Sequence, residues 1–151
     1  MRRLRAILII LVCTAALASA QGQGGVNAAQ IDKIVAMVRD SRVSCVYDFL
    51  LEGKVKCTGS ITVQVPCYKA SGNGIDIYSD GSLRWTVDPA AKEVYIELSG
   101  GPEEYLGYLE SISELKLVGV KKSPPSSDLS AFTFDVSALG KDWVITDLRE
   151  L

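Results

Sequence analysis

Apolar and polar residues alternate along residues 71–98, and this pattern predicts short strands joined by tight turns. The strands are expected at residues 75–78, 83–87 and 93–98, with turns at Asp80-Gly81 and Asp88-Pro89. In each strand the apolar side chains point to one face and the polar side chains to the other. The segment therefore predicts a sheet with one apolar and one hydrated face.

Two longer alternating segments come before it, at residues 44–51 and 55–65, and residues 52–54 form the turn between them. A three-residue turn pairs Phe49 with Cys57 and Leu51 with Val55. A slip of one residue would mix the two faces, so this register is favoured. It separates Cys45 from Cys57 by about 13 Å, too far for a disulfide. One face then holds Cys45, Tyr47, Phe49, Leu51, Val55, Cys57, Ile61 and Val63.

Apolar residues at helical spacing predict two helices, one at residues 28–40 and one from Pro102 to about residue 112. Further strands are expected at residues 67–71, 115–121, 129–136 and 143–148. The short connections favour an antiparallel meander. We therefore expect a mainly β protein of the α+β class, in which two amphipathic helices cover one face of a curved antiparallel sheet.

The first twenty residues have the three parts of a secretory signal peptide. Three arginines, Arg2, Arg3 and Arg5, come before an apolar stretch at residues 7–17, and Ala18-Ser19-Ala20 is a small-residue cleavage site. We expect export with cleavage after Ala20, a flexible N-terminus at residues 21–27 and a single domain at residues 28–151.

Loss of the three arginines changes the net charge from −2 to −5. An acidic domain without a basic patch is a poor nucleic-acid binder, so no nucleic-acid partner is expected.

The composition narrows the possible chemistry because the chain has no histidine. This excludes the Ser-His-Asp triad, the Cys-His dyad and zinc ligation by imidazole. A carboxylate pair could still catalyse glycoside hydrolysis, but Asp80 and Asp88 occupy turn positions where aspartate serves local hydrogen bonding. We therefore expect no catalytic residues, no metal site and no cofactor.

Three cysteines follow the predicted cleavage site: Cys45, Cys57 and Cys67. An oxidising compartment permits disulfides, but an odd number leaves at least one thiol over. Three readings stay open: buried thiols that pack as small apolar side chains, one disulfide with one free thiol, or a reactive or metal-binding cysteine.

Residues 77–96 resemble the core of the outer-membrane lipoprotein carrier family, more narrowly its LolA-like branch. The similar features are a strand, the Asp80-Gly81 turn, a strand with Trp85 at its centre, the Asp88-Pro89 turn and a third alternating strand. The segment 57–63 is similar to the family's early glycine-containing strand. Residues 132–135 and 144–149 resemble its C-terminal strand pair.

The resemblance implies a curved half-barrel sheet with two helices on its concave face and an apolar cavity between them. Such a protein carries lipoprotein acyl chains through the periplasm, from an inner-membrane ABC transporter to an outer-membrane receptor. Its partners would be lipidated proteins, and its task would be transport rather than catalysis. The residues expected to line the cavity are Tyr47, Phe49, Ile61, Val63, Leu83, Trp85, Val87 and Ile96 from the strands and Leu106 and Leu109 from the helical lid.

Two alternatives remain open beside this reading. The domain could be a small binding module of similar fold for another amphiphile or for a protein partner, with its aromatic residues filling a solid core. It could also be an enzyme, which would require two carboxylates that converge in a cleft with perturbed pKa values.

Overall fold

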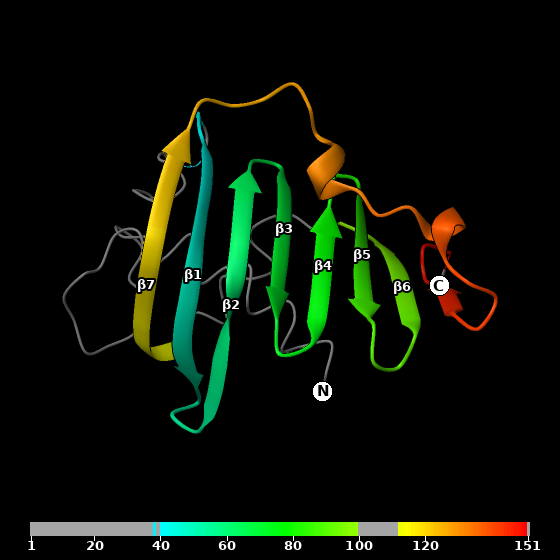
Figure 1. Ribbon diagram of the computed structural model, residues 1–151, viewed down its shortest axis with the longest axis horizontal. Helices are drawn as coiled ribbons and strands as arrows, with labels where there is room; N and C mark the ends of the chain where they lie inside the picture. Colours follow the sequence, from blue (N-terminus) through cyan, green and yellow to red (C-terminus); the bar gives the residue numbers. More distant parts are fainter. Residues whose placement is uncertain (1–37, 39, 100–111, 151) are drawn as a thin grey trace.

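The computed structural model describes residues 38, 40–99 and 112–150, which form one eight-stranded sheet (Figure 1). The strand order across the sheet is β7-β1-β2-β3-β4-β5-β6-β8, and every pair is antiparallel except β6 with β8. The strands are β1 (Arg42–Leu51), β2 (Val55–Gln64), β3 (Cys67–Gly72), β4 (Ile75–Ser79), β5 (Leu83–Asp88), β6 (Glu93–Leu98), β7 (Ile112–Ser123) and β8 (Val144–Asp147).

Strands β1 to β6 form the predicted meander, and the first hairpin has the predicted register. Phe49 lies opposite Cys57, and Leu51 lies opposite Val55. The two expected aspartate turns also form. The Asp80 carboxylate accepts hydrogen bonds from the backbone N–H groups of residues 82 and 83, both at 2.8 Å, and the Asp88 carboxylate accepts one from residue 91 at 3.0 Å. Both carboxylates therefore serve local turn geometry.

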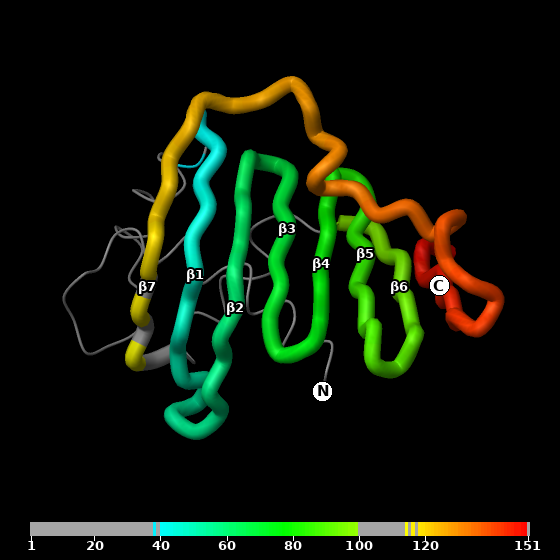
Figure 2. Tube along the Cα trace, viewed as in Figure 1, coloured from blue at the N-terminus to red at the C-terminus, as the bar shows by residue number. Residues whose placement is uncertain are grey.

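The chain between β7 and β8 crosses from one edge of the sheet to the other (Figure 2). It contains two short 3-10 helices, η2 (Ser130–Phe132) and η3 (Val136–Ala138), so the strand predicted at residues 129–136 is wrong. The Asp128 and Asp135 carboxylates accept hydrogen bonds from the backbone N–H groups of Ser130 and Ser137. Such local bonds compete with strand pairing and favour turns.

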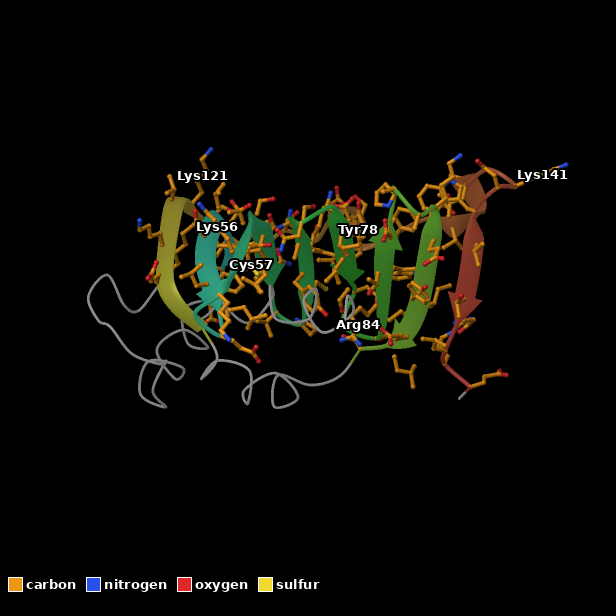
Figure 3. All side chains as sticks on the ribbon, turned by 90° about the horizontal axis from the view of Figure 1, so that it is seen from below. Lys56, Cys57, Tyr78, Arg84, Lys121 and Lys141 are labelled. Atoms are coloured by element: carbon orange, nitrogen blue, oxygen red, sulfur yellow. The ribbon has the colours of Figure 1, made fainter. Side chains whose placement is uncertain are left out.

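The apolar residues change face between β4 and β5. Ile77 of β4 lies opposite Thr86 of β5, whereas Tyr78 lies opposite Trp85. We call the two sides of the sheet the Phe49 face and the Trp85 face, after the buried aromatic residue that each carries. In Figure 3, Tyr78 of β4 and Arg84 of β5 lie on opposite sides of the sheet, as the register of these strands requires.

The expected curved half-barrel with two helices on its concave face is therefore wrong. The sheet is open, and no helix of seven or more residues occurs in the part of the chain that the structure describes. A half-barrel needs one apolar face shared by all strands, and here the two apolar regions lie on opposite faces. The two predicted helices lie outside the described residues, apart from Val38, Asp40 and Ile112. Pairing of β8 with β6 also departs from the expected antiparallel sheet, because this pair is parallel.

None of the described residues belongs to a helix with the length and apolar composition required to cross a membrane.

Candidate functional site

The Phe49 face carries an array of buried apolar side chains that spans four neighbouring strands, β1 to β4. We call this array the apolar wall. Two of its members, Phe49 and Cys57 near the β1–β2 turn, are fully shielded from solvent. The register of the three hairpins places all of its members on the same side of the sheet. They are Val43, Cys45, Tyr47, Phe49, Cys57, Ile61, Val63, Tyr68, Ala70 and Ile77.

Two glycines that face each other, Gly59 of β2 and Gly72 of β3, make room within the apolar wall for the Tyr47 ring. A Cβ at either position would collide with the Tyr47 hydroxyl, so this side chain lies across both glycines. The hydroxyl donates a hydrogen bond to the carbonyl oxygen of Ser71 at 3.3 Å. Tyr47 therefore reaches from β1 over β2 to β3 and ties the three strands together.

The same face becomes polar over β5 and β6, and its β5 side chains, such as Arg84 and Thr86, remain buried. Arg84 donates two hydrogen bonds to one carboxylate oxygen of Glu97, at 3.3 Å from Nε and 3.0 Å from Nη2. The Arg84 side chain is only 5% exposed, whereas the Glu97 side chain is 25% exposed, so the guanidinium is shielded from water and the carboxylate only in part. Ser79 shares a hydrogen bond of 2.8 Å with Ser99. The Phe49 face thus has an apolar part over β1 to β4 and a buried polar part beside it.

One polar group within the apolar wall has no hydrogen-bond partner among the described residues. The Tyr68 hydroxyl is buried and makes no hydrogen bond with any of them, although Tyr68 lies opposite both Val63 of β2 and Ser79 of β4. The neighbouring Ser79 hydroxyl is already bonded to Ser99 and to the backbone N–H of Gly81. Buried hydroxyls in proteins are nearly always hydrogen-bonded, so this exception requires an explanation.

The Trp85 face carries a second, separate core over β4 to β6. Its buried members are Trp85, Val87, Val94 and Ile96. The crossing segment covers them, because Phe134, Val136, Leu139 and Trp143 pack against this cluster. The Phe134 ring contacts the Tyr78 ring with centroids 5.3 Å apart. This cluster is filled by the chain itself and is therefore part of the structural core.

The structure does not bring the predicted cavity residues together on one face. Four of them lie in the apolar wall: Tyr47, Phe49, Ile61 and Val63. Four others, Leu83, Trp85, Val87 and Ile96, lie on the Trp85 face. Leu106 and Leu109 lie outside the described residues. Only the first group can belong to a continuous apolar surface with the rest of the wall.

The three cysteines after the predicted cleavage site are buried and no disulfide joins any two of them, which agrees with the first of the three readings. Burial raises the pKa of the Cys67 thiol, and the nearby Asp80 carboxylate adds to this effect while Arg42 opposes it. Cys67 also donates a hydrogen bond to the Asp80 carbonyl oxygen at 3.3 Å. A buried thiol with a raised pKa is a poor nucleophile. Across residues 38, 40–99 and 112–150, no group of three candidate ligands could hold a metal ion.

Sequence reasoning missed the buried polar part and the Tyr68 hydroxyl. The pairing of Arg84 with Glu97 could have been predicted from the sequence, because the predicted Asp88-Pro89 hairpin places these opposite charges across from each other. No sequence pattern indicates that the Tyr68 hydroxyl lacks a partner, since this depends on where the neighbouring hydroxyls form their hydrogen bonds. No protein-family model and no curated protein sequence matches this chain.

Proposed function

We propose that the apolar wall binds the acyl chains of lipidated proteins and that the domain carries them through the periplasm toward the outer membrane. The observation that supports this most directly is the wall itself, an array of apolar side chains across four strands that is separate from the core on the Trp85 face. The resemblance of residues 77–96 to lipoprotein carriers points the same way. An inner-membrane ABC transporter and an outer-membrane receptor would be the delivery partners.

The physical reason for such a carrier is the cost of moving acyl chains through water. Each buried CH₂ group is worth about 0.8 kcal/mol, so a protein with several acyl chains does not leave a bilayer unaided. A wall without charged side chains can take up the chains without specific contacts. The buried polar part beside it, around Arg84 and Glu97, suits the ester and amide groups that join acyl chains to a protein.

Two matched variants test this proposal. Val63→Thr adds a hydroxyl to the apolar wall, and Val87→Thr makes the same change in the core on the Trp85 face, where the valine is also buried. Burial of a hydroxyl without a partner costs about 1–3 kcal/mol. We expect Val63→Thr to weaken binding of a diacylated peptide at least about fivefold, and Val87→Thr to leave it unchanged. Fluorescence titration with the peptide measures both.

The non-acylated peptide serves as the control, because the wall should not bind it. Equal binding of both peptides, or an equal effect of both variants, would contradict the proposal. Mass spectrometry of lipids that co-purify with the protein from cells then identifies the ligand. An amphiphile other than a lipidated protein would support the alternative of a small binding module.

A further inference from the structure

We propose that the Tyr68 hydroxyl is the point at which this protein recognises the carbonyl oxygen that joins an acyl chain to its headgroup. The inference rests on the proposed function and adds a preference for ester- or amide-linked chains over plain alkyl chains. Tyr68 lies in β3, on the Phe49 face, where the apolar wall meets Ser79 and the buried polar part. A ligand with its chain on the wall places its linkage near this boundary.

The burial of an unpaired hydroxyl supports this assignment. Tyr68 is 7% exposed and its hydroxyl makes no hydrogen bond within the part of the chain that the structure describes, and an unsatisfied buried hydroxyl destabilises a fold. A phenylalanine would fill the same space without this cost. Packing in the wall therefore accounts for an aromatic ring at this position but does not account for its hydroxyl group. A bound acceptor would satisfy the hydroxyl.

The chemistry of the neighbours favours an uncharged carbonyl as that acceptor. A phenol donates one hydrogen bond, which suits an ester or amide oxygen. A free carboxylate would favour a cationic partner. The cation of the buried polar part, Arg84, is already bonded through two nitrogens to Glu97. The site therefore fits an acyl group in ester or amide linkage better than a free fatty acid.

The experiment compares two synthetic peptides that carry an S-diradylglyceryl cysteine with a free amino terminus. One has two ester-linked palmitoyl chains, and the other has two ether-linked hexadecyl chains, which lack the carbonyl oxygens. Each is titrated into the full chain and into Tyr68→Phe. We expect the unmodified protein to bind the ester peptide about fivefold to tenfold more tightly than the ether peptide. We expect Tyr68→Phe to bind both peptides equally, with the ether affinity unchanged.

Thermal unfolding of the free proteins supplies a readout independent of ligand. Tyr68→Phe should melt at the same or a higher temperature, because the substitution removes an unsatisfied buried group.

Equal binding of both peptides by the unmodified protein would overturn this inference and leave the carrier proposal standing. An ester preference that persists in Tyr68→Phe would also overturn it. If the unmodified protein binds neither peptide, both proposals fail. Palmitate is titrated in parallel, and a preference for palmitate over the ester peptide that Tyr68→Phe abolishes would assign the hydroxyl to a carboxylate instead.

Discussion

Gly59 shows how one small residue organises a large part of the sheet. Its missing side chain leaves space for Tyr47, whose ring passes over β2 and whose hydroxyl bonds to the backbone of β3. Aromatic side chains that cover glycines in this way stabilise strand register. Register matters here because a slip of one residue would turn the apolar wall to the other face.

This arrangement predicts a large cost for Gly59→Ala. The new Cβ would collide with the Ser71 carbonyl oxygen, which is backbone and cannot turn away, as well as with the Tyr47 hydroxyl. We expect the free energy of unfolding to fall by about 3 kcal/mol, measured by urea unfolding. Gly53→Ala is the control, since its Cβ would meet nothing within 4 Å.

Gly53 has a positive φ of 65°, so its substitution carries only the backbone cost of about 1–2 kcal/mol. A Gly59→Ala protein as stable as Gly53→Ala would show that the three strands are not packed as described.

At the scale of the elements, the segment between β7 and β8 packs on the Trp85 face. Arg42 of β1 contacts the first part of this segment. Its Nη2 donates a hydrogen bond of 2.8 Å to the Asp128 carbonyl oxygen, and its guanidinium lies 5.0 Å from the Phe132 ring centroid. Gln64 of β2 bonds to the backbone of Ser126 through both of its side-chain polar atoms. The later part packs on the core through Phe134 and Trp143.

Phe134→Ala tests the contribution of this segment. The substitution removes the ring that contacts Tyr78 and exposes the cluster around Trp85. Because Phe134 is half-buried, we expect a loss of about 2 kcal/mol in the free energy of unfolding. Leu129→Ala, in the same segment but 39% exposed, should change it by less than about 0.5 kcal/mol. Equal effects in urea unfolding would mean that Phe134 does not anchor the segment.

The hairpins show which elements the sequence predicts and which it does not. In β1 and β2 the three-residue turn and the apolar pattern agree, so the register was predictable. Between β4 and β5, Asp80 fixes a turn of four residues, with hydrogen bonds from its backbone N–H and to its carboxylate. A turn one residue shorter would have placed Ile77 and Trp85 on the same face. The alternation within each strand does not reveal whether the turn has three or four residues. The residues expected to line one cavity therefore lie on two opposite faces of the sheet.

At the scale of the whole molecule, the sheet separates two cores that pack on opposite faces. The apolar wall belongs to β1 to β4, and the filled cluster around Trp85 belongs to β4 to β6 and the crossing segment. Strand β4 contributes Ile77 to one and Tyr78 to the other. This division means that the C-terminal segment packs on the Trp85 core, on the opposite face of the sheet from the apolar wall.

Because the backbone bonds between β4 and β5 join the two cores in one sheet, we expect them to unfold together. The chain contains two tryptophans, Trp85 and Trp143, and both lie in the cluster on the Trp85 face. Tryptophan fluorescence therefore reports on that core alone, whereas far-UV circular dichroism reports on the whole sheet. The two urea transitions should coincide, as a cooperative single domain requires.

Val63→Thr and Val87→Thr make this test specific. Each alters only one core, yet in a cooperative sheet each shifts the fluorescence midpoint and the dichroism midpoint by the same amount. A fluorescence transition that responds to Val87→Thr and stays fixed in Val63→Thr would show that the two halves unfold independently. Independent unfolding would allow the wall to open for a ligand while the Trp85 core stays folded. Coincident transitions would instead require the ligand to enter with the sheet intact.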